Sequence, residues 1–326
     1  MAALDLGLIF ALMALGVYLT FRVLDLADLT IDGSFTTGAA VCAVLIINGG
    51  NPWLATLSGG LAGLVAGLVT GLLTTWGKIH PLLAGILTQI ALYSVNLRIM
   101  GKANLSMLRA VTVFTPLKES RQIGTPVSVG VLALGVGLVV AALVWFLSTD
   151  LGLAMRATGD NEGMARAQGI NTDAQKILGL ALSNGLVGLS GALFAQYQGS
   201  SDIGMGIGLI VAGLASVIIG TALIPNGRVL VTAIAVVTGS IIYRSVIQAA
   251  LTIEGFDTND MKLLSALIVI AALLLPRWAV FKQIRNRRSK QFTTYTWDVP
   301  TEETVDAGVA NRPSQGVTRR MRRKNA

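Results

Sequence analysis

Long apolar runs recur along most of the chain and constrain its fold more than any other feature. An α-helix needs about 20 predominantly apolar residues to cross the hydrocarbon core of a bilayer. Helices satisfy their own backbone hydrogen bonds in lipid, so they are the natural form of such runs. The sequence therefore predicts an all-α polytopic membrane protein with about eight to ten transmembrane helices. Nine apolar segments can be marked, at about 4–21, 33–47, 53–75, 82–99, 128–147, 177–196, 207–223, 229–251 and 261–280.

Composition excludes several other classes of protein. Charged residues make up 13% of the 326 residues, against about 25% in soluble domains. The single cysteine, Cys42, and the single histidine, His80, rule out a disulfide framework and a His/Cys zinc site. A membrane enzyme is disfavoured because the apolar runs carry no catalytic constellation. The segment ending Gly77-Lys78-Ile79 lacks the first glycine and the hydroxyl of a phosphate-binding loop. We therefore expect no cofactor and no metal in this chain.

The excess positive charge lies at the C-terminal end. Residues 277–326 hold 12 Lys/Arg and 4 Asp/Glu, whereas residues 1–276 hold 13 of each. This pattern predicts a transmembrane domain at 1–281 and a basic, mostly disordered tail at 282–326. Because Lys and Arg accumulate in cytoplasmic segments, we expect the C-terminus inside a multi-pass cell membrane. A basic tail there favours contact with membrane lipid and gives no argument for nucleic acid.

The positions of the basic residues also bear on the number of membrane crossings, but they leave two arrangements open. Arg22, Lys78, Arg228 and the stretch 156–176 fall on one side if nine segments cross, with the N-terminus outside. The loop 100–127 disagrees, because its four basic residues would then lie outside. An even number of crossings, with 33–47 re-entrant, is therefore an alternative.

Two small-residue-rich hairpins echo one another. Segment 33–75 turns at the Gly-Gly-Asn-Pro sequence of 49–52, and segment 207–251 turns at the Ile-Pro-Asn-Gly sequence of 224–227. In the nine-crossing arrangement the two turns lie on opposite sides of the membrane. Opposite hairpins of this kind predict an inverted repeat, which is typical of transporters.

Four glycines recur every fourth residue in the third apolar run. This spacing places Gly59, Gly63, Gly67 and Gly71 on one helical face. A face without side chains lets another helix approach closely, which stabilises membrane helices in the absence of a hydrophobic driving force. We expect packing within the chain, with a dimer contact as the alternative.

The segment between the first two runs is rich in polar residues. Asp28, Thr30 and Asp32 lie there, within Asp-Leu-Thr-Ile-Asp. One hypothesis makes Asp32 the N-cap of a helix that starts at Gly33, since a carboxylate accepts from the free N–H groups of a helix start. The other makes 28–32 a break in a membrane helix that lines the transport path.

Arg244 lies inside an apolar run, where an ionised side chain is costly. It either snorkels towards the outer surface near Glu254 and Asp257, or faces the pathway and attracts an anionic group of the solute. Other polar residues within the runs are more often contacts between helices than ligands. These residues are Gln89, Asn96, Asn184 and Gln196.

A polar stretch follows the fifth apolar run. Its Thr, Gly, Asp and Asn residues favour a helix start, with Asp160 as a cap and Glu162 in the first turn. Gly169 would end a short helix over 161–168. A helix of that length is unstable alone and should dock against something.

Several segments resemble the membrane permeases of ABC importers of the branched-chain amino acid and ribose type. They are GLAMRATGDNEGMARAQGIN from Gly152, the following LSNGLVGLSGALFAQYQG, and the opening run to Ala39. DLTIDGSF and LLAGILTQIALYSVNLRIMG resemble a branch linked in places to tryptophan or tyrosine uptake. The likeness covers about residues 1–280, and the basic tail departs from it.

The resemblance implies an uptake system in which two permease copies work with a separate ABC ATPase and an extracytoplasmic solute-binding protein. The solute would be amino acid-like, and the tryptophan or tyrosine branch favours an aromatic amino acid. The segment 152–176 would couple the permease to the ATPase, through Arg156, Gly159, Asn161, Glu162, Ala165, Gly169 and Ile170. The alternative is a self-sufficient secondary transporter or channel, for which Asp28 and Asp32 are the only candidate ion-coupling carboxylates. The translocation-pathway candidates are Asp28, Thr30, Asp32 and Arg244.

Overall fold

The described part of the chain is mostly helical, as the apolar runs predict. The computed structural model describes residues 1–120, 122, 124–224, 227–250, 263 and 266–270. It divides into compact units at Met1–Arg277 and Trp278–Ala326, and the predicted tail 282–326 lies outside the described residues. The elements are α1 (Ala2–Tyr18), the π-helix η1 (Leu19–Val23), α2 (Thr30–Ile47), α3 (Pro52–Thr75), α4 (Pro81–Met100), β1 (Asn104–Ser106), α5 (Thr115–Glu119), α6 (Pro126–Ser148), α7 (Asp150–Asp160), α8 (Glu162–Ala167), α9 (Thr172–Gln198), β2 (Ser200–Asp202), α10 (Leu209–Leu223) and α11 (Val229–Ala250).

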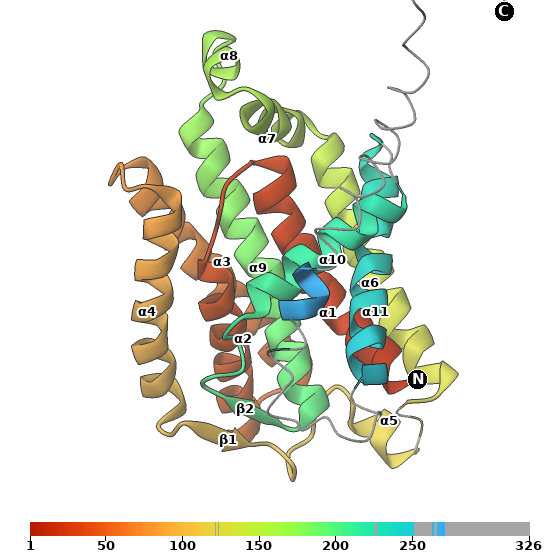
Figure 1. Cartoon of the computed structure of the whole chain (residues 1–326). Helices are drawn as coiled ribbons and strands as arrows, with labels where there is room; N and C mark the ends of the chain where they lie inside the picture. The colour runs from red at the N-terminus through yellow and green to blue at the C-terminus, as the bar shows by residue number, and fades with distance from the viewer. Residues whose placement is uncertain (121, 123, 225–226, 251–262, 264–265, 271–326) are drawn as a thin grey trace, which may run out of the picture. The chain divides into compact units, whose positions relative to one another are not determined.

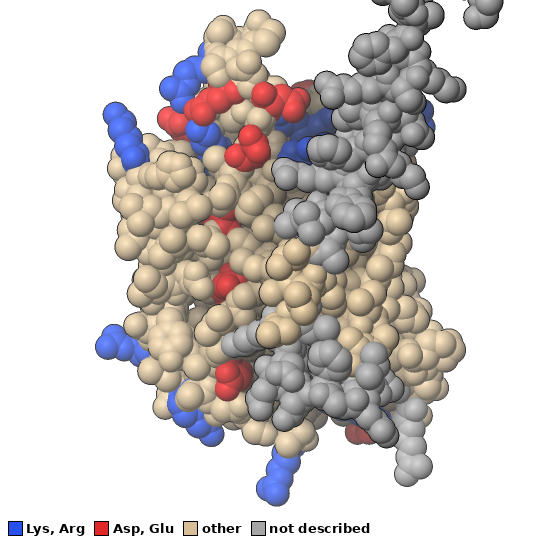
Figure 2. Space-filling view, viewed as in Figure 1, with Lys and Arg blue, Asp and Glu red and all other residues tan. Residues whose placement is uncertain are grey.

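Eight of the nine predicted apolar segments correspond to helices. Seven of these helices are long and apolar enough to cross a membrane, and α10 is a shorter apolar helix. The ninth segment, 261–280, lies mostly outside the described residues. Charged side chains gather at the two ends of the helix bundle, with few between them (Figure 2). This distribution is the one a membrane-spanning bundle requires.

Helices α1 and α9 form the interior of the bundle. Every residue of α1 from Gly7 to Tyr18 is buried, as expected for a helix that is apolar on all sides. Three serine hydroxyls from neighbouring helices donate to backbone carbonyls of α1. Ser183 donates to Gly16 at 2.7 Å, Ser190 to Ile9 at 2.8 Å and Ser240 to Gly7 at 2.9 Å. Small side chains therefore bring the backbones of α9 and α11 against α1.

The glycine face of α3 packs against α9. A Cβ at Gly59 would lie 2.8 Å from the Ala192 Cβ, and one at Gly71 would lie 2.8 Å from the Ile177 Cα. Cβ atoms at the two glycines between them would meet backbone oxygens of α9. The prediction of packing within the chain is confirmed along the whole face. Because α9 covers this face, it is not open for a dimer contact.

Two hairpins run in opposite directions, as the predicted inverted repeat requires. Helix α2 begins midway along the bundle after the non-helical stretch 24–29, and α3 returns along the full length (Figure 1). Helix α10 also begins midway, after the stretch 203–208, but runs to the opposite end before α11 returns (Figure 1). Helices α2 and α10 therefore have their N-termini in the interior.

Candidate functional site

Asp32 joins the two interior helix starts. It is the third residue of α2, and its Oδ2 accepts from the Gly208 N–H at 2.7 Å. Its Oδ1 accepts from the Ile210 N–H at 2.8 Å. These N–H groups have no partner within α10, and the helix dipole favours a carboxylate beside them. Asp32 thus caps α10.

The hypothesis that Asp32 caps its own helix is wrong. Helix α2 begins at Thr30, before Gly33, and the Asp32 carboxylate is engaged with another helix. The predicted break at 28–32 is correct only for 28–29. The non-helical stretch is 24–29, between η1 and α2, and Thr30 to Asp32 belong to the first turn of α2. That this stretch lines the transport path stays a prediction. A second break at 203–208 meets it from the other half of the chain.

Asp28 holds the first break in place. Its Oδ1 accepts from the Thr30 N–H at 2.8 Å, and its Oδ2 accepts from the Asn184 Nδ2 at 2.6 Å. The Thr30 hydroxyl in turn bonds the Thr70 hydroxyl at 2.8 Å. Asp28 is only 1% exposed. These contacts tie the start of α2 to α9 and α3, so Asp28 and Thr30 stabilise the break from its buried side.

A cavity of about 410 Å³ adjoins Asp32 between α2, α4 and the second break. Its walls carry both polar and apolar side chains. Gln89 and Asn96, for which the sequence favours contacts between helices, both line this cavity. Gln89, Tyr93 and Asn96 recur at i, i+4 and i+7, a spacing that marks a polar helical face and could have identified the site. The lining residues are Asp32, Gly33, Thr36, Gln89, Ile90, Tyr93, Ser94, Asn96, Ile203 and Ile207.

The other two polar residues of the runs are contacts between helices, as predicted. Asn184 bridges α9 to Asp28. Gln196 Oε1 accepts from the Val113 N–H at 2.9 Å, and its Nε2 donates to the Thr56 hydroxyl at 2.7 Å. Such bonds fix neighbouring membrane helices in one arrangement.

Arg244 lies over an aromatic ring of α1. Its Cζ is 3.4 Å from the centroid of the Phe10 ring, a cation–π contact. Phe10 stacks on Phe35 at 5.7 Å and meets Phe194 edge-on at 5.0 Å. The snorkelling partners considered above, Glu254 and Asp257, lie outside the described residues. The aromatic cluster therefore accommodates the guanidinium within the bundle.

The predicted short helix is α8, at one extremity of the bundle (Figure 1). Its cap is Asn161, whose Oδ1 accepts from the Met164 N–H at 2.9 Å. Asp160 is the last residue of α7 and does not cap α8, which corrects that prediction. Gly169 ends the helix with φ +83°, as predicted, and the Ile170 N–H donates to the Ala165 carbonyl at 3.1 Å. These bonds form a Schellman motif.

Ion pairs fasten α8 to the start of α9. Glu162 Oε1 accepts from Lys176 Nζ at 2.7 Å and from Arg166 at 3.2 Å. The hydrogen bond from Lys176 lowers the pKa of the Glu162 carboxyl below its ordinary value. Ala165 faces inward and is buried, whereas Met164 is 63% exposed. The helix is thus held at its base and presents an apolar side chain outward.

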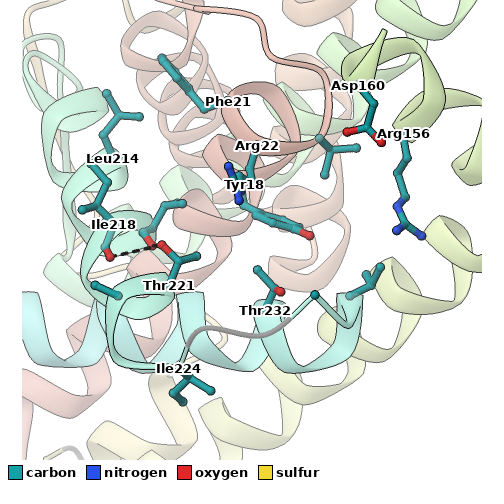
Figure 3. Close-up of a pocket in the computed structure, with 15 residues that line it drawn as sticks. Tyr18, Phe21, Arg22, Arg156, Asp160, Leu214, Ile218, Thr221, Ile224 and Thr232 are labelled. Carbon is teal, nitrogen blue, oxygen red and sulfur yellow. Dashed lines mark hydrogen bonds between the residues drawn. The ribbon is translucent and has the colours of Figure 1, made fainter. Parts of the chain in front are cut away.

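Helix α7 lies over a large cavity of about 950 Å³ at the same end (Figure 3). Arg156 and Asp160 of α7 line it together with Tyr18 and Arg22. Figure 3 shows the Tyr18 hydroxyl and the Arg156 guanidinium directed into the same space.

The residues assigned to the coupling segment by resemblance have unequal surroundings. Gly159 packs against the end of η1, where a Cβ would meet the Val23 carbonyl oxygen. Ala165 is buried, and Arg156 and Ile170 are half-buried. Only Asn161, Glu162 and Gly169 are exposed.

Known proteins of the same kind cover nearly the whole described chain. Residues 2–274 match the family described as branched-chain amino acid transport system / permease component. A tyrosine transport system permease protein of Clostridioides difficile (strain R20291) is 42% identical over 268 residues, 82% of this chain and 88% of the relative. The protein RP368 of Rickettsia prowazekii (strain Madrid E) is 33% identical over 275 residues, 83% of this chain and 95% of the relative.

One solved structure is similar over most of the chain. It is described as a metal-chelate type ABC transporter in an inward-facing conformation, and it covers 85% of this chain and 84% of its own at 16% identity, with a TM-score of 0.49. The family match and the 42% identical permease agree with the resemblance found in the sequence. This chain therefore belongs to the branched-chain amino acid transport system permease family, the membrane component of ABC-type transport systems.

Proposed function

We propose that this permease imports an aromatic amino acid-like solute, driven by a separate ATPase subunit that docks on α8. The observation that carries the docking site is the arrangement of α8 itself. Six residues do not make a stable helix alone, yet this one is capped, ended by a Schellman motif and ion-paired to α9. Its outward side chain, Met164, is apolar and exposed. A fixed base with an exposed apolar tip suits the transmission of force from a partner.

The route from α8 into the bundle is short. Lys176, which holds Glu162, lies in the first turns of α9, and α9 packs on α1, α2 and α3. Asn184 of the same helix bonds Asp28 at the first break. Movement of α8 would therefore reach the interior helix starts through one rigid element. Binding of ATP to the partner would shift the balance between two arrangements of the breaks.

Docking of the ATPase on α8 also determines which end of the bundle faces which side of the membrane. The end that carries α7 and α8 would face the cytoplasm, together with the C-terminus, in the cell membrane. The opposite end, with β1 and β2, would receive solute from an extracytoplasmic binding protein. A second permease copy would complete the transporter, and lipid would surround it. Asp32, which joins the two breaks, would lie beside the pathway.

The secondary-transporter alternative has little support from the carboxylates. Both Asp28 oxygens and both Asp32 oxygens already accept hydrogen bonds from the chain. Such bonds give both carboxylates a structural role, so their presence in the bundle does not by itself indicate ion coupling.

Docking is tested by Met164→Glu. Met164 is exposed, so the permease should fold normally, while the charge should abolish co-purification of the ATPase and solute-stimulated ATP hydrolysis. Leu108→Glu is the matched control, since Leu108 is 80% exposed in the β1–α5 connection at the other end. It should leave ATPase co-purification intact. Normal ATPase coupling in Met164→Glu would contradict the docking site, and solute accumulation by the permease alone would refute ATP-driven import.

A further inference from the structure

The cavity beside Asp32 is rich in hydrogen-bond acceptors and has no cationic side chain among its described lining residues. We propose that this cavity recognises the primary ammonium group of an amino acid through Asp32 and Asn96. The inference rests on the proposed function, because it assumes that the solute is amino acid-like. Beyond the proposed function, it names the residues that would select the solute and the chemical group of the solute that they would bind.

Asp32 supplies the negative charge. Its oxygens accept backbone N–H groups of Gly208 and Ile210 at the start of α10, and Leu209 adds a further backbone interaction. Two carboxylate oxygens together have room for about four donors. No Lys or Arg in the described part of the chain forms an ion pair with it. Asp32 is 7% exposed, so water reaches it little. A buried carboxylate with spare acceptor sites and no counter-charge is well suited to bind an ammonium group.

Asn96 supplies an acceptor that nothing in the described residues uses. It is 1% exposed, and its Oδ1 has no hydrogen-bond partner. Buried acceptors are nearly always paired, since an unpaired one destabilises the fold. Asn96 lies on the wall of the same cavity as Asp32. A ligand with several N–H donors would satisfy both side chains at once.

The rest of the cavity fits an amino acid with an apolar or aromatic side chain. Ile203 gives an apolar wall, and the exposed side chains of Ile90, Tyr93 and Ile207 form the open rim. The half-buried Gln89 amide can donate to a carboxylate. The volume of about 410 Å³ lies within the range of small-molecule sites. The cavity should therefore discriminate against a solute that keeps the aromatic ring but lacks the amine.

The test compares two probes on the full chain in detergent by saturation-transfer NMR. Tyramine carries the ring and the ammonium group, whereas 3-(4-hydroxyphenyl)propionate carries the ring without it. We expect the unaltered chain to bind tyramine at least about tenfold more tightly, a difference typical of a lost charge-assisted hydrogen bond. Asn96→Leu should weaken tyramine binding by about tenfold while leaving the thermal midpoint unchanged or raised, because it removes an unpaired acceptor.

Thr88→Val is the matched control. Thr88 is buried on the same stripe of α4, and its hydroxyl bonds only the Ala84 carbonyl of its own helix among the described contacts. It should bind tyramine as the unaltered chain does. Absent tyramine binding, equal binding of the two probes, or unchanged tyramine affinity in a folded Asn96→Leu variant would overturn the inference. The probe comparison uses the unaltered chain and needs no variant to fold.

Failure of this inference is distinguishable from failure of the proposed function. ATP-driven uptake of tyrosine without preference for tyramine would overturn the ammonium site alone. Preference for tyramine in a chain that needs no ATPase for uptake would overturn the coupling to ATP and leave the ammonium site standing.

Discussion

Helices α3 and α4 are consecutive, yet they pack in opposite ways. Helix α3 presents glycines to α9, so the two backbones meet along their length. Helix α4 touches the bundle along a single stripe, and much of the rest of its surface is exposed. The difference separates a closely packed scaffold from a helix that the rest of the bundle holds by one face only. The buried stripe of α4 consists of Ala84, Gly85, Thr88, Leu92, Asn96 and Met100.

The largest expected effect comes from filling the scaffold interface. Gly63→Leu would place a side chain where a Cβ already meets the Asn184 carbonyl oxygen and lies 3.0 Å from the Gly188 Cα. Overpacking of this kind costs about 1–3 kcal/mol and more where backbone must move. We expect a large fall in the detergent unfolding midpoint and failure to assemble with the ATPase.

Gly135→Leu is the control for that substitution. Gly135 lies in α6, and among the described residues no atom beyond its own helix lies within 4 Å of the position that a Cβ would take. Leucine is the better helix former by almost 1 kcal/mol, so this variant should be as stable as the unaltered chain or more so. Equal behaviour of the two variants would break the distinction between a tight scaffold and open surface.

The scaffold is the part of the fold that sequence predicts best. The four-residue spacing of Gly59 to Gly71 specifies a bare face, and helix geometry alone then demands a close neighbour. The end of α8 at Gly169 is also predictable from local sequence, because this helix end requires only one residue with a positive φ. The apolar lengths of the crossings follow from bilayer thickness.

The candidate site depends on contacts that no local pattern contains. Asp32 caps a helix 176 residues away, so its own sequence context pointed to α2 instead. Asn96 and Gln89 have the same residue types as Asn184 and Gln196, which bridge helices. Only the tertiary arrangement shows that the Asn184 and Gln196 amides donate to side chains outside their own helix, whereas Asn96 lines a cavity with its Oδ1 unpaired among the described residues.

A middle-sized effect is expected where the two halves of the chain meet. Asp32→Ala removes the acceptor of the Gly208 and Ile210 N–H groups, and loss of a helix cap costs about 0.5–2 kcal/mol. Hydrogen exchange should accelerate at those two amides and not at the α3–α9 interface. Asp32→Asn keeps one acceptor oxygen, so exchange at these amides should be faster than in the unaltered chain and slower than in the alanine variant. Unchanged protection at Gly208 and Ile210 in the alanine variant would show that the break is held by other contacts.

The smallest effect concerns the link between α8 and the scaffold. The pKa of Glu162 in the folded chain lies below its ordinary value, mainly because Lys176 donates to it. Its stabilisation is therefore present above the unfolded-state pKa and is lost as the pH falls through the folded-state value. The pair is partly exposed, so the contribution is about 0.2–1 kcal/mol.

Hydrogen exchange of α8 measured at neutral pH and well below the ordinary glutamate pKa of about 4.3 should show this dependence. Protection of α8 should drop at the lower pH in the unaltered chain, since protonated Glu162 no longer attracts Lys176 and Arg166. Glu162→Gln should be less protected at neutral pH and insensitive to the change. Amides of α3 should not respond in either protein. If α8 in the unaltered chain showed equal protection at both pH values, the Asn161 cap and the Gly169 turn would suffice to hold the helix, and the ion pair would not be needed to hold it.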